Sequence, residues 1–418
     1  MSQWLLNAVS RAEAVDDWLA PKRQASLQLL RDTQWPTRRT EAWKYTPLVA
    51  IADSTFTSAA NHAKVSVDPV ESLNSIDLIF VDGELVTPVA DNLPAGLSIT
   101  AFAEVSAEDK LWATETFSNA KPQRHLFGLV NDALATSGLL IDVAANADIA
   151  QPLRVVVRLS EGCEAHTRIL VRVGESAKIA VVEDFDGSAP SFNTGFAEYD
   201  IAANAELEHY RFALQTGEAL SIGGSHFNLA AKAKLNSTLV GFGSKLSRLD
   251  VDVNYCGEFA ETQMNAIYLL DGEELFDLHS TIEHAVPNCT TEENVRGIVA
   301  DHARAVFNGR IHIHRDAQKT LAELNNRNLL LSRNAEINTK PELEIYADDV
   351  RCAHGATIAE IDKKALYYLQ SRGISKAQAQ VMLSFGFINE LVDQMPNTIL
   401  AEWLRPQLRE RFAQMEVK

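Results

Sequence analysis

Residues 247–255 read SRLDVDVNY and carry the clearest structural signal in the sequence. Apolar side chains at Leu249, Val251, Val253 and Tyr255 alternate with polar ones, namely Arg248, Asp250, Asp252 and Asn254. In an extended chain, alternate residues point to opposite sides, so the apolar side chains share one face and the polar side chains share the other. This period of two predicts a β-strand that is buried on its apolar face.

Similar short runs recur between about residue 65 and residue 350. They are RVVVRL from 154, RILVRV from 168, KIAVVE from 178, YRFAL from 210, RAVFNGRIHIH from 304 and LEIYA from 343. So many strands without intervening amphipathic helices exclude a doubly wound parallel sheet and leave a sandwich, a barrel or a β-solenoid. A β segment of roughly 280 residues without a domain break favours the solenoid, because a solenoid grows by adding turns.

Both ends of the chain have helical patterns. Near the start, Trp4, Leu5 and Ala8 fall on one helical face. Near the end, Asp362 and Ser375 are placed to cap helices. We therefore predict an N-terminal helical region at 1–64, a mainly β core at 65–350 and a C-terminal helical region at 351–418. The last helix carries an apolar stripe that either packs on the core or binds a partner: Ile399, Leu400, Trp403 and Leu404.

Composition narrows the classes of function. The 418 residues include 38 basic and 56 acidic side chains, for a net charge of −18. This excess argues against nucleic acid or an anionic membrane as the main partner. The first residues lack the basic and apolar regions of a signal peptide, and no apolar run is long enough to span a membrane. We expect a soluble, cytoplasmic protein, and four dispersed cysteines without a CxxC pair indicate neither a disulfide framework nor a zinc ribbon.

Candidate chemistry is concentrated late in the chain. No P-loop, GxSxG or HExxH motif is present, which disfavours nucleotide and serine hydrolysis. Imidazole and thiolate are ligands that zinc, iron and copper prefer. Residues at i and i+2 on a strand share a face, so His312 can act with His314, and Cys352 with His354. A metal site and a polar ladder on a strand face both fit this late group, which comprises His279, His284, Cys289, His312, His314, Cys352 and His354.

Residues 36–48, PTRRTEAWKYTPL, form a loop rich in basic and aromatic side chains. The loop suits docking of another molecule, but we favour a packing role, in which Trp43 and Tyr45 hold the first helices on the β core.

Four segments resemble signatures of the SufB/SufD family of iron–sulfur cluster assembly proteins. They are PTRRTEAWKYTPL at 36–48, VFNGRIHIHRDAQKT at 306–320, NRNLLLS at 326–332 and DDVRCAHGATIAEIDKKALYYLQSRGI at 348–374. SufB chains usually carry an N-terminal cysteine cluster, and no cysteine here precedes Cys163, so the chain resembles the SufD branch. The segment LAELNN at 321–326 departs from the glutamine-containing version of the family.

The resemblance implies a right-handed parallel β-helix between helical ends, acting as a non-catalytic scaffold. It implies pairing with a SufB-like chain, or a homodimer without one, and binding of a SufC-like ABC ATPase through the C-terminal helices that carry Ile399, Leu400, Trp403 and Leu404. The family's functional histidine corresponds to His354, which with Cys352 would be a transient metal or cluster ligand at the subunit junction. No cofactor is expected in the isolated chain; a nascent iron–sulfur cluster, and reduced flavin as a candidate, belong to the assembled complex.

Two other classes compete with this interpretation. A β-helix carbohydrate enzyme would need paired carboxylates in a cleft. The carboxylates here mostly alternate with apolar residues, as on a solvated strand face. A β-helix or barrel metalloenzyme would use the late His/Cys group, with His312 and His314 as two ligands.

Overall fold

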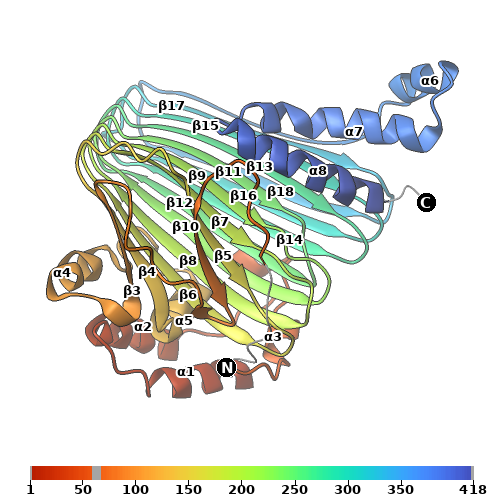
Figure 1. Ribbon diagram of the computed structural model, residues 1–418. Coiled ribbons are helices and arrows are strands. Elements are labelled where there is room, and N and C mark those ends of the chain that lie inside the picture. Colours follow the sequence, from red (N-terminus) through yellow and green to blue (C-terminus); the bar gives the residue numbers. More distant parts are fainter. Residues whose placement is uncertain (1, 59–66, 416–418) are drawn as a thin grey trace.

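The computed structural model describes residues 2–58 and 67–415, so the predicted boundary between residues 64 and 65 lies outside the described residues. The predicted β-solenoid is confirmed: strands stack in successive turns between helices from the two ends of the chain (Figure 1). None of the helices in the described ranges is long and apolar enough to cross a membrane.

The strands form two sheets that face each other. The first sheet has the order β19-β17-β15-β13-β11-β9-β7-β5-β1-β2, and the second has the order β18-β16-β14-β12-β10-β8-β6-β4-β3. The first contains β1 (Ile76–Val81), β2 (Glu84–Leu85), β5 (Leu153–Arg158), β7 (Lys178–Phe185), β9 (Glu206–Ala213), β11 (Lys234–Gly241), β13 (Glu261–Leu270), β15 (Thr290–Val299), β17 (Leu321–Leu330) and β19 (Arg351–Glu360). The second contains β3 (Leu97–Ala101), β4 (Ser137–Val143), β6 (Glu164–Val173), β8 (Ser191–Ile201), β10 (Ala219–Leu229), β12 (Leu246–Tyr255), β14 (Leu275–His284), β16 (Arg304–Ile313) and β18 (Glu336–Ile345).

Neighbouring strands pair in parallel, except β1 with β2 and β3 with β4. From β8 onward, strands of the second sheet begin at residues 191, 219, 246, 275, 304 and 336, so one turn takes 27 to 32 residues. The alternating apolar residues of β12 fill the space between the sheets, and Val253 is completely buried there. The prediction for this strand is therefore confirmed on its apolar face.

Turns between successive strands use a repeated left-handed residue. Within the described ranges, seven such residues have φ between 58° and 63°: Asn146, Ser176, Asn204, Lys232, Phe259, Asn288 and Lys319. After Ser176, Asn204, Lys232 and Phe259 comes a completely buried alanine, and after Asn288 comes the completely buried Cys289. A small side chain fits where the chain turns tightly against the core, so this short pattern marks each turn of the solenoid.

Helices cover the outer faces of both sheets (Figure 1). The N-terminal helices are α1 (Gln3–Ala12), α2 (Ala20–Asp32), η1 (Glu41–Trp43) and α3 (Val49–Ala52), followed by η2 (Phe102–Glu104), α4 (Ala107–Thr116) and α5 (Leu126–Leu134). The C-terminal helices are α6 (Lys363–Ser371), α7 (Lys376–Asp393) and α8 (Thr398–Gln414). Apolar side chains of α1, α3 and α5 pack on the second sheet, whereas those of α7 and α8 pack on the first.

Two features differ from the sequence prediction. Helices α4 and α5 lie inside the segment predicted to be mainly β, where no helix was identified. Helix α5 is buried along almost its whole length, so it has no polar stripe to reveal a helical period. Strand β19 extends to Glu360, inside the segment predicted to be helical. Its sequence RCAHGATIAE contains mostly small or polar residues, and therefore lacks the apolar alternation of a buried strand.

Candidate functional site

The last turn of the solenoid ends in two open strands. Strands β18 and β19 each stand at the end of a sheet, so one edge of each is unpaired within the described part of the chain. Ile345 pairs in register with the buried Ile313 of the preceding turn, and Ile358 pairs with the buried Asn328. Both isoleucine side chains therefore point toward the space between the two sheets. With no further turn above them, Ile345 is 41% exposed and Ile358 is 46% exposed. The apolar interior is thus uncovered at this end.

Cys352 and His354 lie on this open end. They are in register with Ala322 and Leu324, both of which are buried in the core between the sheets. Cys352 is half-buried against that core, and burial raises the pKa of its thiol. His354 is exposed and has no hydrogen bond or ion pair among residues 2–58 and 67–415. The strand therefore presents an accessible imidazole beside a protonated thiol.

The other late histidines and Cys289 do not converge on His354. His279 pairs with Asp277, with Nε2 and Oδ1 2.9 Å apart. His284 is buried and stacks on Tyr255, and burial lowers its pKa to about 3. Cys289 occupies a turn position where the preceding turns have alanine. The predicted group is therefore divided among the outer face, the interior and a turn.

Two groups of three potential metal ligands occur within the described ranges, and neither includes Cys352 or His354. One brings His312 and His314 to Glu283, whose Oε2 lies 2.6 Å from His312 Nδ1 and 3.0 Å from His314 Nε2. Arg310 binds the other oxygen of this carboxylate at 2.7 Å. The pairing of His312 with His314 was predicted, but the contribution of Glu283 from the adjacent strand was not.

The second group, His125, His226 and Asp252, was missed. Its members come from the loop before α5, from β10 and from β12, so no local spacing connects them. The interpretation of carboxylates that alternate with apolar residues as a solvated strand face does not hold for β12. Asp252 is only 1% exposed, because the loop before α5 covers the outer face of this strand. A buried carboxylate needs partners, and the partners here are the two histidines and Arg124.

The packing interpretation of residues 36–48 holds for Trp43 but not for Tyr45. Trp43 is buried against the second sheet, and the Arg248 guanidinium lies 4.0 Å from its ring centroid. Tyr45 is 40% exposed.

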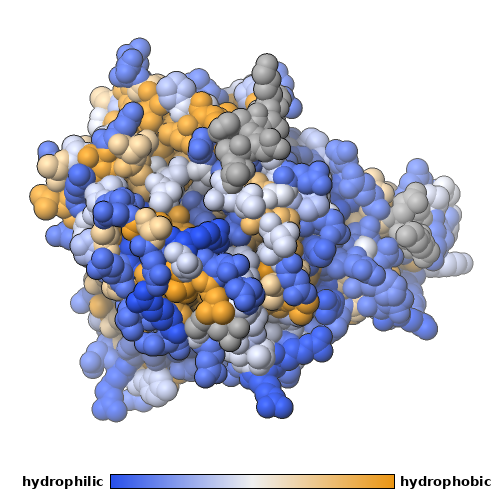
Figure 2. All heavy atoms as spheres, turned by 90° about the horizontal axis from the view of Figure 1, so that it is seen from below, coloured by the Kyte–Doolittle hydropathy of each residue, from blue (hydrophilic) through white to orange (hydrophobic). Residues whose placement is uncertain are grey.

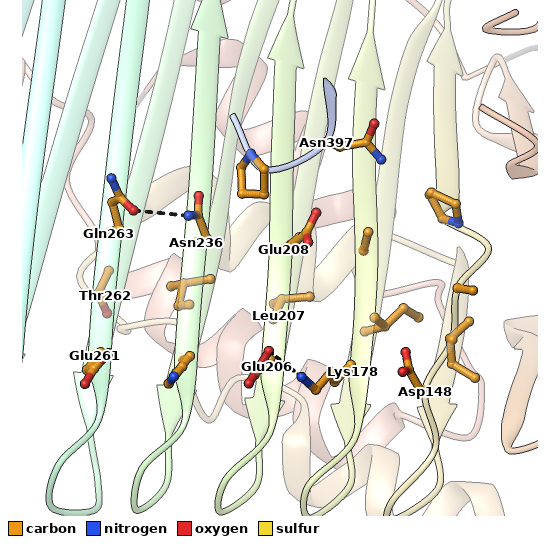
Figure 3. A pocket seen from close by; sticks show the side chains of 18 of the residues that line it. Asp148, Lys178, Glu206, Leu207, Glu208, Asn236, Glu261, Thr262, Gln263 and Asn397 are labelled. Carbon is orange, nitrogen blue, oxygen red and sulfur yellow. Dashed lines mark hydrogen bonds and ion pairs between the residues drawn. The ribbon is translucent and has the colours of Figure 1, made fainter. Parts of the chain in front are cut away.

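A groove of about 590 Å³ follows the outer face of the first sheet beside the turn between α7 and α8 (Figure 3). Charges of alternating sign occupy equivalent positions along its floor: Asp148, Lys178, Glu206, Lys234 and Glu261. Lys178 Nζ and Glu206 Oε2 are 2.9 Å apart. Such a ladder stabilises the strand register by pairing its own charges, and does not provide the isolated acid and base of a glycosidase.

The predicted ATPase-binding stripe has a structural role. Leu400 and Leu404 are completely buried between α8 and the first sheet. Trp403 lies against Phe212, with ring centroids 5.3 Å apart. Ile399, at 37% exposed, is the most accessible of the four. These side chains hold α8 on the solenoid, so most of the stripe is closed to a partner.

Comparison with known proteins places this architecture in a family. A model described as "SUF system FeS cluster assembly, SufBD core domain" matches residues 157–387. A second, "SufBD protein N-terminal region", matches residues 9–155. The chain belongs to the SufBD family. The two matched ranges together include the solenoid, the N-terminal helices from residue 9 onward and most of α7.

Among SufBD relatives, the chain is 32% identical to "Iron-sulfur cluster assembly protein SufD" of Escherichia coli K12, over 94% of this chain and 92% of that protein. It is 29% identical to an iron–sulfur cluster assembly SufBD family protein of Synechocystis, over 93% of this chain and 90% of the relative. The protein is thus a SufD-like member of an iron–sulfur cluster assembly family, and this prediction is confirmed. The solenoid also contradicts the barrel that was one form of the metalloenzyme alternative.

Proposed function

We propose that this SufBD chain is a non-catalytic scaffold subunit of an iron–sulfur cluster assembly complex. In this proposal it pairs with a SufB-like chain through the last turn of its solenoid and holds a SufC-like ABC ATPase with its C-terminal helices. The observation that carries the proposal is the open last turn. There, an uncovered apolar interior meets two strand edges that are unpaired in the part of the chain that the structure describes.

An open turn favours a partner for two reasons. Unpaired strand edges present backbone donors and acceptors to another sheet. Solenoids also need a polar cap at each end, whereas this last turn exposes Ile345 of β18, Ile358 of β19 and Tyr346, which directly follows β18. A related solenoid placed end to end would cover these side chains. A second copy of this chain has the same edge, so we propose a homodimer when the SufB-like chain is absent.

Pairing would place His354 in the new interface. Removal of water there favours a neutral imidazole, which is a ligand for iron. We propose that His354 contacts the nascent cluster, which is cargo of the complex and not a resident cofactor. The raised pKa of the Cys352 thiol disfavours its thiolate, so Cys352 is the weaker ligand. Reduced flavin would belong to the assembled complex.

We propose that the ATPase binds to α6 and α7, because the stripe on α8 is mostly buried. Helix α6 projects beyond the solenoid, and its own residues include none that is buried (Figure 1). Tyr367 is 72% exposed, Tyr368 57% and, on α7, Met382 53%. The face of the molecule that is seen from below in Figure 2 is mostly hydrophilic and carries separate apolar patches. Exposed aromatic side chains and Met are typical of protein interfaces, which supports this location.

Co-expression of the full chain with tagged SufB-like and SufC-like proteins tests the proposal. We expect all three to purify together, and Tyr367→Ala with Tyr368→Ala to lose the ATPase but keep the SufB-like chain. Leu111→Ala on α4, whose side chain is equally exposed at 72%, is the matched control and should keep both. Failure of the wild-type chain to retain either protein would contradict the proposed function.

A further inference from the structure

Three potential metal ligands meet on the outer face of the second sheet, beneath the loop that leads into α5. His125 Nε2 and His226 Nδ1 each lie 2.8 Å from Asp252 Oδ2. All three ligand atoms lie within 4.8 Å of one another. We propose that His125, His226 and Asp252 bind one divalent first-row metal ion, with Zn²⁺ and Fe²⁺ as the candidates. This site is separate from His354 and does not depend on the proposed scaffold function.

The spacing suits such an ion. Zinc bonds to imidazole nitrogen and carboxylate oxygen are about 2.0–2.2 Å long, so tetrahedral ligand atoms lie roughly 3.3 Å apart. The two contacts of 2.8 Å are slightly shorter than this, and the upper limit of 4.8 Å is longer. Small side-chain rotations therefore suffice to place the three atoms around one ion.

His226 supplies an independent indication. Its side chain is completely buried, and its Nε2 has no hydrogen-bond partner among the described residues. Its Nδ1 has one polar neighbour there, Asp252 Oδ2 at 2.8 Å, without the geometry of a hydrogen bond. Buried polar atoms are almost always paired, because an unpaired one has lost its hydrogen bonds to water without replacing them. One face of the ring stacks on Phe196, with centroids 5.9 Å apart and planes inclined by 9°. The ring is thus held rigidly, and a metal ion at Nδ1 would satisfy that nitrogen.

The surrounding charges resemble the outer shell of a metal site. His125 turns its second nitrogen, Nδ1, toward Asp250 Oδ1 at 3.7 Å. Asp250 is itself held by two hydrogen bonds from Arg248. Metal-bound histidines usually have such a carboxylate behind them, because it fixes the ring and increases its basicity. On the other ligand, Arg124 contacts Asp252 Oδ1 and leaves Oδ2 for the ion.

A metal ion could reach this group from solvent, and the number of protein ligands also suits a metal site. Asp252 and His125 line a cavity of about 630 Å³ that extends past His279 toward β16 and β18. His226 is buried behind these two residues. Three protein ligands, two of them facing the cavity, leave one position for water or an external ligand, as in zinc sites that are not purely structural. In the competing group, Arg310 already pairs with Glu283 and His314 is 45% exposed in its side chain. We therefore assign the resident ion to the buried group.

Zinc binding by the full-length chain alone tests this inference. Chelator-treated protein is dialysed against Zn²⁺, its metal content is measured, and the affinity is determined by calorimetry. We expect about one ion per chain, with X-ray absorption showing two imidazole ligands. His125→Ala should weaken binding at least tenfold, and Asp250→Asn about 10–100-fold, which is typical of outer-shell changes. His312→Ala with His314→Ala is the matched control and should retain the ion.

Circular dichroism must show that each variant is folded. His125 is in a loop, so His125→Ala keeps the test decisive if Asp250→Asn unfolds. No zinc in the wild-type chain, or zinc that is lost only in the His312 and His314 variant, would overturn the inference. Because no partner protein is present, neither result bears on cluster assembly, which is tested separately.

Discussion

The sequence around a residue predicts the role of some side chains in this protein but not of others. The family resemblance pointed to His354 and Cys352, and the structure places both on one face of β19 at an open end. The group formed by His125, His226 and Asp252 was unpredictable from local sequence, because its members lie on separate elements. A fold that brings distant residues together leaves no spacing to recognise in one sequence.

His354→Ala should abolish cluster formation by the assembled complex. The side chain is exposed and unpaired within the described residues, so the free energy of unfolding should change by less than about 0.5 kcal/mol. Cluster content is measured from the absorption spectrum and bound iron of the purified complex. Cys352→Ser should reduce it less. His302→Ala, an exposed histidine in a turn, is the control. Normal cluster content in the His354 variant would refute the proposed ligand role.

Glu293 should make the protein less stable as pH rises. Its carboxylate is completely buried between the sheets, receives one hydrogen bond from Ser280 and has its pKa raised to about 7 by burial. In the unfolded chain it loses its proton near pH 4.5, whereas the folded chain keeps it until about pH 7. Between these values the folded state binds more protons, so its stability falls as pH increases.

Glu293→Gln removes this dependence by keeping the group neutral. We expect the variant to gain about 1–3 kcal/mol relative to wild type between pH 5 and pH 8. Urea unfolding at both pH values measures this, with Glu292→Gln, an exposed neighbour, as control. An identical difference between variant and wild type at the two pH values would show that Glu293 does not titrate in this range.

At the scale of elements, the strands were predictable wherever their apolar face is buried, as in β12. Strand β19 and helix α5 were not, because β19 has few apolar residues and α5 has almost no exposed side. A usable signal was nevertheless present. A left-handed residue followed by a small buried one recurs at Ser176-Ala177, Asn204-Ala205 and Lys232-Ala233. This repeat of 28 residues distinguishes a solenoid from a sandwich or a barrel.

Helix α8 should stabilise the solenoid through its buried stripe. Leu404→Ala removes a completely buried side chain from the contact with the first sheet, so the free energy of unfolding should fall by about 2–5 kcal/mol. Ile399→Ala, on the same helix but 37% exposed, should cost less than about 1 kcal/mol. Urea unfolding of both variants compares them. Equal, small effects would mean that α8 is not part of the cooperative fold.

At the scale of the whole molecule, one end of the solenoid differs from the other. At the first end, the terminal strands β2 and β3 pair antiparallel with β1 and β4, and Leu97 and Ile99 of β3 are buried. At the other end, β18 and β19 have no further strand beside them among residues 2–58 and 67–415, and Ile345 and Ile358 are exposed. This asymmetry explains why a partner would bind at the last turn.

The affinity for a purified SufB-like chain, measured by calorimetry with an Ile358→Asp variant, tests the pairing surface most directly. A charge at this open end would be buried in the complex without a partner, so the dissociation constant should rise at least tenfold, or about 1.4 kcal/mol. Leu111→Asp places the same charge on α4, where the side chain is 72% exposed, and should bind as wild type does. Equal affinity of the Ile358 and Leu111 variants would contradict pairing through the last turn.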